Sequence, residues 1–324
     1  MKNFINNKLK LSTKFYSAII GATPSKGARS PLLWNRAYKM LKKPYKMYPF
    51  DVDEKNLHNL IKYLKNDKYF IGGSVTAPYK EKVIKLLDGV SSESKKIGSV
   101  NTLIKNGNRI YGENTDFYGA MVSLREFKNK KNILILGCGG AGKSVILACF
   151  KTFKKSKFSI YNRNNNKVFS FLKRLKISSK VRNMKNLDNL ENIDLIINTT
   201  SIGFDSWIKD KKNFKNLKFF SPLAKIGKPI SSNMLNHKFL LKNLNIISKN
   251  NFDNLRFLAR NNKASVFDII YNPLLTKLLF QAKLCGMKIK NGFEMNLQQA
   301  IKSFMIVNKI KNKKKILKAM SRNG

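Results

Sequence analysis

A glycine-rich stretch is the part of the sequence whose residue types and spacing point most directly to chemistry. Residues 132–144 read NILILGCGGAGKS, an apolar strand that enters a full G-x-G-x-x-G pattern and continues as a helix. The first glycine permits a tight turn, the second leaves room for a pyrophosphate, and the third lets helix and strand approach. The N–H groups at the helix start then face the phosphates. The pattern predicts cofactor contacts at Gly137, Gly139, Gly140, Ala141 and Gly142, with an ordinary βα turn as the alternative.

The same stretch also satisfies a second pattern, G-x-x-x-x-G-K-S, through Lys143 and Ser144. A P-loop phosphotransferase is therefore an alternative from another enzyme class. That class needs a second strand that ends in an aspartate to help hold Mg²⁺. Asp194 precedes its strand and Asp268 lies within an apolar stretch, so neither fits. The dinucleotide interpretation is favoured, and under it we expect replacement of Lys143 to matter little.

The end of the next expected strand carries the residues that would select the dinucleotide. In a dinucleotide fold this position lies about 20 to 25 residues after the glycine loop, where the sequence has Asn162 and Arg163, with Lys167 nearby. An acid there would bind the ribose 2′-hydroxyl, whereas a donor and a fixed positive charge favour a 2′-phosphate. We predict NADP rather than NAD as the cofactor.

Composition limits the partners of this 324-residue chain. The formal charge is +46, yet 54 lysines stand against only 10 arginines, together with 39 asparagines. These excesses fit the codon pool of an AT-rich genome, and arginine is the residue that reads guanine and grips phosphate. We therefore expect no specific nucleic acid as a partner, although the positive field favours anionic small molecules.

Metal and membrane sites are not indicated by the sequence. Cys138, Cys149 and Cys285 lack CxxC spacing, and His58 and His237 are isolated, so no metal is expected. The apolar runs are strand-sized and far short of the 18 or more residues that a membrane span needs. We expect a cytoplasmic protein without membrane contact. Residues 1–16 are basic and free of acids, so a transit peptide is the open alternative.

Short apolar runs alternate with helical stretches from about residue 16. The glycine loop lies between a strand over 132–136 and a helix over 140–153, and strands over 157–161 and 195–198 follow. Such alternation indicates an α/β fold with parallel sheets, and the length suits two blocks. Residues 205–262 lack clean periodicity and are interpreted as surface elements and a candidate insertion. The basic tail over 310–324 is expected to be frayed.

Several separated motifs, taken in order, resemble those of the shikimate dehydrogenase family. The resemblance covers about residues 18 to 305. Besides the glycine loop and Asn162-Arg163, the motifs are PSKGARSPLLWN (24–35), SVTAPYK (74–80), GSVNT (98–102), GENTD (112–116), NTTSIG (198–203), DIIYNPLLT (268–276) and GFEMNLQQA (292–300).

The resemblance implies two α/β domains separated by a cleft. Residues 1–116 plus 271–324 would form the substrate-binding domain, and 117–270 a Rossmann-type NADP-binding domain. The implied reaction is reversible NADPH-dependent reduction of 3-dehydroshikimate to shikimate in the chorismate pathway, by a monomer or homodimer. A quinate or shikimate-like dehydrogenase with another hydroxy acid as substrate is the nearest alternative.

The resemblance also implies roles for single residues. Lys80 would donate a proton to the substrate oxygen or stabilise its charge, and Asp116 would position Lys80. Amides and hydroxyls suit a polyol because they both donate and accept. The implied substrate contacts are Ser30, Thr76, Asn101, Tyr271 and Gln299. Further cofactor contacts are implied at Thr200 and Gly292, with Ile202 to Phe204 near the nicotinamide.

The first motif departs from the family pattern, which commonly has Ser-x-Ser-Pro followed by His-Asn. Here the stretch reads Ala28-Arg29-Ser30-Pro31 with Trp34-Asn35. Only one of the two hydroxyls expected at the substrate carboxylate is present, although Ser25 or the charge of Arg29 could substitute. Loss of one neutral hydrogen bond costs about 0.5 to 1.5 kcal/mol. Phe117 after Asp116 and Asn296 after Met295 also deviate.

Overall fold

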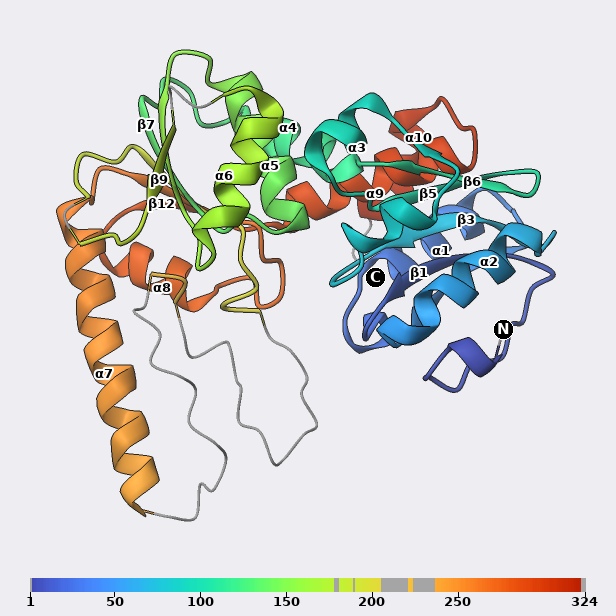
Figure 1. The fold of residues 1–324 in the computed structure, drawn as a ribbon, viewed down its shortest axis with the longest axis horizontal. Helices are drawn as coiled ribbons and strands as arrows, with labels where there is room; N and C mark the ends of the chain where they lie inside the picture. The colour runs from blue at the N-terminus through green and yellow to red at the C-terminus, as the bar shows by residue number, and fades with distance from the viewer. Residues whose placement is uncertain (1, 178–180, 189, 205–220, 224–236, 322–324) are drawn as a thin grey trace. The chain divides into compact units, whose positions relative to one another are not determined.

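The computed structural model describes residues 2–177, 181–188, 190–204, 221–223 and 237–321. Within it the chain forms two compact units, and each is described by itself. The first contains residues 1–123, 143–148 and 294–324, and the second contains 124–142 and 149–293. The boundary therefore falls twice within helix α5 (Gly140–Thr152), whose residues 143–148 group with the first unit. Figure 1 labels the elements along the chain.

The first unit is built on a mixed sheet in the order β2-β1-β3-β5-β6-β4. Parallel pairing joins β1 to β2 and to β3, and β4 to β6, while β5 runs antiparallel to both of its neighbours. The strands are β1 (Phe15–Gly21), β2 (Tyr45–Asp51), β3 (Phe70–Val75), β4 (Gly89–Val90), β5 (Thr102–Asn106) and β6 (Arg109–Glu113).

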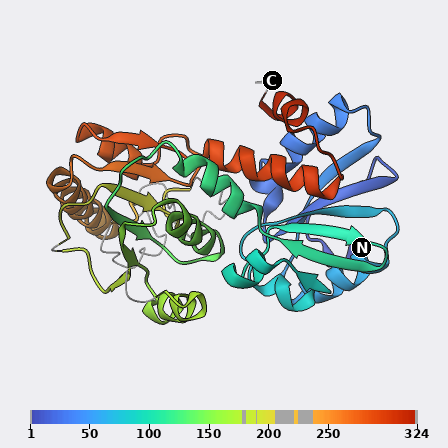
Figure 2. The same ribbon diagram turned by 90° about the horizontal axis from the view of Figure 1, so that it is seen from above.

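Helices cover this sheet on both faces because successive side chains of a strand point to opposite sides. Tyr16, Ala18 and Ile20 of β1 enter one apolar cluster with helix α2, while Ile19 enters another with α1, α9 and α10. Figure 2 shows α9 and α10 on the same side of the sheet as α1. The helices of this unit are α1 (Ser30–Met40), α2 (Leu57–Asn66), α3 (Ser92–Ile97), α4 (Thr115–Leu124), α9 (Phe293–Val307) and α10 (Lys313–Ser321), with 3₁₀ turns η1 (Lys2–Phe4), η2 (Pro24–Lys26), η3 (Glu54–Asn56) and η4 (Lys82–Leu86).

The second unit holds an all-parallel sheet in the order β12-β11-β10-β7-β8-β9. The chain winds outward from β7 through β8 and β9, then returns to β10 on the other side of β7. This is the strand order of a dinucleotide-binding fold, in which ligands bind where the direction of winding reverses. The elements are β7 (Asn132–Leu136), β8 (Lys157–Tyr161), β9 (Val181–Met184), β10 (Leu195–Asn198), β11 (Ser265–Asp268), β12 (Lys288–Lys290), α5, α6 (Asn165–Leu175), α7 (His237–Arg260) and α8 (Lys277–Leu284).

The division of the chain differs from the expected domain bounds in three places. Residues 117–123 and 143–148 were expected in the NADP-binding domain but group with the first unit, and residues 271–293 were expected with the substrate-binding domain but group with the second unit. For residues 271–293 the reason is β12, which pairs with β11 as the last strand of the parallel sheet. The sheet of the first unit is mixed rather than wholly parallel, because the hairpin of β5 and β6 runs antiparallel.

The C-terminal tail is a second correction, because residues 313–321 form a helix rather than a frayed end. Helix α10 spans Lys313–Ser321 and buries Ile316, Ala319 and Met320 against the cluster that contains α1. Of the stretch 205–262, the structure describes only residues 221–223 and 237–262. Helix α7 spans His237–Arg260 of the second part. The rest of the candidate insertion lies outside the described residues.

The N-terminal segment is part of the first unit's packing. Phe4, Ile5, Leu9 and Leu11 pack against the cluster on the α2 face. The Asn7 side chain accepts from the backbone N–H of Asp51 at 2.9 Å, on the edge strand β2.

Candidate active site

Two oppositely charged side chains meet, one from the turn that follows β3 and one from the start of α4. The Nζ of Lys80 donates to Oδ2 of Asp116 at 2.6 Å, and the two side chains are 19% and 8% exposed. The backbone of Lys80 is fixed by a hydrogen bond, in which its carbonyl accepts from the N–H of Val100 at 2.8 Å. Asp116 lies in the first turn of α4, where the Asn114 side chain caps the helix by accepting from Phe117 N–H at 3.0 Å.

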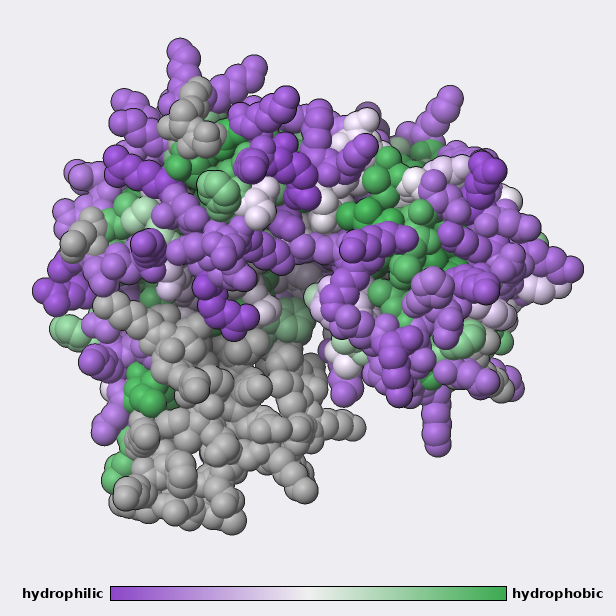
Figure 3. Space-filling model, viewed as in Figure 1, coloured by the Kyte–Doolittle hydropathy of each residue, from purple (hydrophilic) through white to green (hydrophobic). Residues whose placement is uncertain are grey.

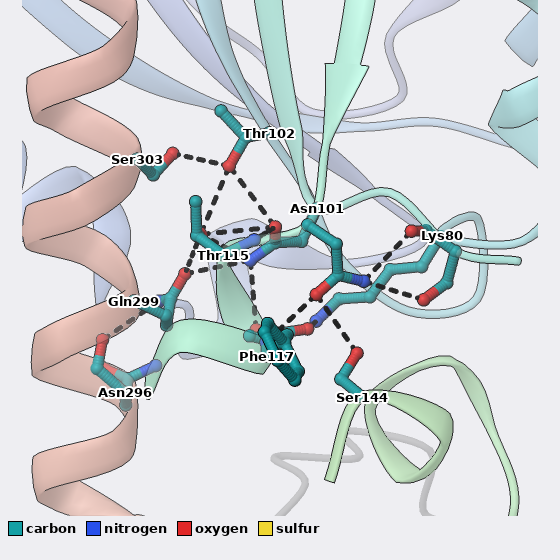
Figure 4. Close-up of polar contacts among 12 residues, drawn as sticks. Lys80, Asn101, Thr102, Thr115, Phe117, Ser144, Asn296, Gln299 and Ser303 are labelled. Atoms are coloured by element: carbon teal, nitrogen blue, oxygen red, sulfur yellow. Dashed lines mark hydrogen bonds and ion pairs between the residues drawn. The ribbon is translucent and has the colours of Figure 1, made fainter. Parts of the chain in front are cut away.

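A network of amide and hydroxyl groups surrounds this pair (Figure 4). The buried Asn101 lies at its centre, and its Nδ2 is 3.0 Å from each of three oxygens, those of Thr115, Asp116 and Gln299. The Oδ1 of Asn101 accepts from the N–H of Thr115 at 2.7 Å. Because Asn101 bonds both to the Asp116 carboxylate and to Gln299 of helix α9, it fixes the carboxylate in place.

Helix α9 presents one polar face to the network. Thr102 Oγ1 donates to Ser303 Oγ at 2.8 Å, one turn beyond Gln299 on this helix. The Nε2 of Gln299 donates to the carbonyl of Asn296 at 3.0 Å, which orients its oxygen toward Asn101. Gly119 of α4 makes the approach of this helix feasible, because a Cβ there would lie 2.5 Å from the carbonyl of Met295.

The turn before Asp116 is anchored by the short helix α3. Ser91 caps α3 by accepting from Ser94 N–H at 3.1 Å, and it donates to Oε1 of Glu113 at 2.7 Å. The same carboxylate oxygen accepts from the backbone N–H of Asn114 at 2.8 Å. Glu113 therefore fixes the backbone that leads to Asp116.

Thr76 and Ser30 also belong to the first unit. Thr76 follows β3 directly, and its N–H donates to the carbonyl of Ile20 at 2.8 Å. Ser30 is the buried first residue of α1, followed by Pro31, whose fixed φ suits a helix start.

The structure also shows what surrounds the departures at the first motif. The Ser25 hydroxyl donates to Asp51, and the Ser25 N–H donates to the same carboxylate at 2.9 Å. Ala28 packs against the apolar cluster of α1 and α9. Arg29 donates from Nη1 to Oδ1 of Asn296 at 3.2 Å, which places a guanidinium beside the turn that carries Gln299.

In the second unit, the glycine loop joins β7 to α5 with the expected geometry. Gly137 has φ +100, and a Cβ at this residue would lie 2.8 Å from Thr199 Oγ1. A Cβ at Gly142 would lie 2.7 Å from the same oxygen, whereas one at Gly139 would meet nothing within 4 Å. Helix α5 begins at Gly140 without a side-chain cap at Gly139. The open space beside Gly139, at the start of the helix, fits a pyrophosphate.

Asn162 connects the end of β8 to the glycine loop. Its Oδ1 accepts from the N–H of Cys138 at 3.0 Å, and its Nδ2 donates to the carbonyl of Asn164 at 2.7 Å. Asn164 then caps α6 by accepting from Lys167 N–H. Arg163 is exposed at this turn, beside a helix start that favours anions.

The turn after β10 is stabilised by Asp268 at the end of β11. Asp268 is fully buried and accepts from Asn198 Nδ2 at 2.9 Å and from Thr276 Oγ1 at 2.7 Å. Burial raises the pKa of this carboxyl to about 7, against the lowering effect of its hydrogen bonds. Asn198 Oδ1 in turn accepts from the N–H and the hydroxyl of Thr200. Asp268 therefore holds the loop that contains Thr200.

The two other predicted residues of the second unit lie on neighbouring loops. Tyr271 is half-buried, and its ring stacks edge-on against Phe204 with centroids 6.1 Å apart. Gly292 is buried, and its N–H donates to the carbonyl of Ile270 at 2.9 Å. A Cβ at Gly292 would lie 1.8 Å from the carbonyl oxygen of Ile269, so close backbone approach explains this glycine.

Sequence reasoning missed several residues that carry the geometry. Thr115, Ser303 and Glu113 complete the network around Asp116, and only the position of Thr115 and Glu113 within GENTD gave a signal for them. Thr199 was also missed, although its hydroxyl donates to the carbonyl of Leu136 at 2.8 Å beneath the glycine loop. Asp268 was considered only as a metal ligand of the P-loop alternative.

In the described part of the chain, no helix combines the length and apolarity that a membrane span requires. Comparison with known proteins gives a consistent result. Residues 19–103 match the family model of the shikimate dehydrogenase substrate binding domain. The chain is 34% identical over 315 residues to a shikimate dehydrogenase (NADP(+)) of Methanococcus maripaludis, with 95% of each chain covered.

Two further proteins support the same assignment. A shikimate dehydrogenase (NADP(+)) of Methanosphaera stadtmanae is 31% identical, with 87% of this chain and 88% of the relative covered. Among solved structures, the shikimate dehydrogenase of Aquifex aeolicus superposes with a TM-score of 0.70 at 26% identity, covering 98% of this chain and 100% of that one. With this similarity extending over nearly its whole length, the chain belongs to the shikimate dehydrogenase family.

Proposed function

We propose that this protein is an NADP-dependent shikimate dehydrogenase that interconverts 3-dehydroshikimate and shikimate. The observation that carries the proposal is the Lys80–Asp116 pair, at 2.6 Å, inside a network of amides and hydroxyls. Carbonyl reduction needs a proton donor at the oxygen as a hydride reaches the carbon, and NADPH supplies that hydride when it is bound.

Lys80 is the proton donor in the direction of reduction. Its ammonium gives a proton to the substrate oxygen as the C–O double bond becomes a single bond, and the neutral amine takes the proton back in oxidation. Asp116 keeps the ammonium in one orientation and accepts from it throughout. Because Asn101 holds the other carboxylate oxygen at 3.0 Å, the pair stays aligned without ordering new groups.

The substrate is an anionic polyol, and the first unit offers groups of the required chemistry. Asn101 and Gln299 present amides, while Thr76 and Ser30 present hydroxyls, each able to donate or accept. We assign these residues, with Tyr271 of the second unit, to the substrate's hydroxyls and carboxylate. Arg29, beside Asn296, adds a positive charge near the turn of Gln299, which offsets the hydroxyl lost at Ala28.

The cofactor is assigned to the second unit. Gly137 to Gly142 would receive the pyrophosphate, because Gly139 leaves open space before the start of α5. Arg163, with Asn162 fixing the turn, would bind the 2′-phosphate. Thr200 would contact the nicotinamide end, and Gly292 would line the same region. Most of the described side chains on the face seen in Figure 3 are hydrophilic, and the net charge of +46 draws anionic ligands to the protein.

We also infer a place in aromatic amino-acid and chorismate biosynthesis, since shikimate is the product of reduction. We infer that the enzyme acts in the cytoplasm on a small-molecule substrate, as a monomer or homodimer, without specific nucleic acid and without membrane contact. The scarcity of arginine among its basic residues supports the absence of a nucleic-acid role.

The test is a matrix of two acids and two cofactors. Purified protein is mixed with shikimate or quinate and with NADP⁺ or NAD⁺, and formation of the reduced cofactor is followed by absorbance. We expect the highest kcat/KM with shikimate and NADP⁺. Preference for quinate would move the assignment to the related hydroxy-acid dehydrogenase, and failure with both acids would refute it.

A further inference from the structure

Two consecutive residues of α5 contact the segments that carry the Lys80–Asp116 pair. The Nζ of Lys143 lies 2.7 Å from Oε2 of Glu81, and the two side chains are 8% and 31% exposed. The next residue, Ser144, donates from Oγ to Oδ1 of Asn114 at 3.1 Å. Both contacts lie within the first compact unit, which includes residues 143–148.

The partners of these two residues are direct neighbours of the pair in sequence. Glu81 follows Lys80 and precedes the 3₁₀ turn η4. Asn114 lies two residues before Asp116 and caps α4 with the same oxygen that accepts from Ser144. Figure 4 shows Ser144 approaching from its own helix toward the turn at Phe117. One helical turn therefore fixes the backbone on both sides of the ion pair.

The chemistry of the contacts favours positioning over stability. A buried ion pair seldom adds net stability, because desolvation of the charges offsets their attraction. Such a pair does fix the positions of its two side chains, because separating them would leave a buried charge without its partner, which is strongly unfavourable. Asn114 is itself anchored, because its Nδ2 donates to the carbonyl and the hydroxyl of Ser99, each at 2.9 Å.

We propose that Lys143 and Ser144 are positioning residues for the Lys80–Asp116 pair, an inference that rests on the proposed function of that pair. Neither touches the reacting atoms; each acts through the residue it holds. This assigns a role to the lysine of the P-loop-like pattern, whose Nζ binds a carboxylate of this chain. It also replaces the expectation that substitution of Lys143 matters little.

The decisive variant is the double substitution Lys143→Met with Glu81→Gln, because it removes one positive and one negative charge and leaves the net charge unchanged. We expect kcat for shikimate oxidation to fall about tenfold, since small displacements of a catalytic group are costly. KM for NADP⁺ should stay within about twofold, as no phosphate contact is lost. Ser144→Ala should lower kcat in the same way, by a smaller factor.

A second readout does not depend on turnover. Acylation of Lys80 by acetic anhydride, quantified by peptide mass spectrometry, should be severalfold faster in the double variant, because a loosened pair protects the amine less. Lys65→Met with Asp88→Asn is the matched control, since it removes another ion pair of the first unit, 3.0 Å long. The control should change neither readout.

The outcomes separate this inference from the proposed function. Wild-type protein that does not oxidise shikimate refutes the proposed function, and the acylation rate then decides the inference alone. Wild-type kcat and wild-type acylation of Lys80 in the double variant would overturn the inference. A loss confined to KM for NADP⁺ would also overturn it, because that result would place Lys143 at the phosphates.

Discussion

Asn101 donates to Oε1 of Gln299 at 3.0 Å, although 198 residues separate them in the chain. This bond joins the residue directly before β5 to helix α9, and it shares Asn101 with the Asp116 carboxylate. A substrate that binds here meets amides that are already oriented, so little ordering entropy is lost on binding.

Gln299→Ala is therefore expected to weaken binding of shikimate more than it slows the chemical step. Loss of one amide that bonds to the substrate and to Asn101 should raise KM about tenfold, with kcat reduced by a smaller factor. Steady-state kinetics check this. Gln298→Ala, at the adjacent position of α9, is the matched control and should leave KM unchanged. Equal effects of the two substitutions would remove Gln299 from the substrate site.

Cofactor selection should depend on Arg163. Arg163→Ala removes the charge assigned to the 2′-phosphate, so the Kd of NADP⁺ should rise by about tenfold to a hundredfold, while that of NAD⁺ changes little. Isothermal titration with both cofactors measures the difference. Arg174→Ala, at the exposed end of α6, should alter neither Kd. Parallel weakening of both cofactors would show that Arg163 does not read the phosphate.

Asp268 should make stability depend on pH. Burial raises its pKa to about 7 in the folded protein, above the value of 3.8 for an isolated aspartate. The folded state therefore holds this proton more tightly, so its contribution is complete below about pH 4 and is lost as pH rises to about 7. Between these two pKa values, each pH unit lowers the free energy of unfolding by about 1.4 kcal/mol.

Asp268→Asn should abolish that contribution, because an amide has no proton to lose in this range. Urea unfolding at pH 5 and pH 8 measures it: the drop in unfolding free energy from pH 5 to pH 8 should be smaller in the variant than in the wild type. An identical drop in both proteins would mean that Asp268 does not titrate with folding.

Helix α10 should contribute to stability through its apolar face. Ile316→Ala creates a cavity against the cluster of α1 and α9 and should cost about 2 to 5 kcal/mol of unfolding free energy. Lys318→Ala, on the exposed side of the same helix, should cost little. Chemical denaturation compares the two variants, and a neutral Ile316→Ala would restore the expectation of a frayed tail.

Local patterns allowed much of the fold to be predicted. The strand over 132–136 and the helix that starts at Gly140 occur where the glycine pattern placed them. That pattern is encoded in consecutive residues, so it needs no knowledge of the rest of the chain. Among the elements that were not predicted, β2 and α10 show two different reasons. Strand β2 contains Pro49, which is tolerated because β2 is an edge strand, and α10 has its few apolar residues spread among lysines.

The candidate site was predicted only as far as motifs extend. The resemblance named Lys80 and Asp116, and the structure brings them together. The contact of Lys143 with Glu81 could not be found in this way, because it joins residues 62 positions apart and Glu81 lies outside the motifs. The same holds for Ser303 and Thr102, whose hydrogen bond spans 201 positions.

The central claim is that Lys80, held by Asp116, transfers the proton when shikimate is oxidised by NADP⁺. The most direct measurement compares NADPH formation by the wild type, Lys80→Ala and Lys82→Ala, with Kd of NADP⁺ measured in parallel. Lys82 pairs with Glu54 at the surface and serves as the control. We predict that Lys80→Ala lowers kcat by about a hundredfold to ten-thousandfold, with Kd of NADP⁺ unchanged and Lys82→Ala fully active. Lys80→Ala protein that forms NADPH at the wild-type rate would contradict the account.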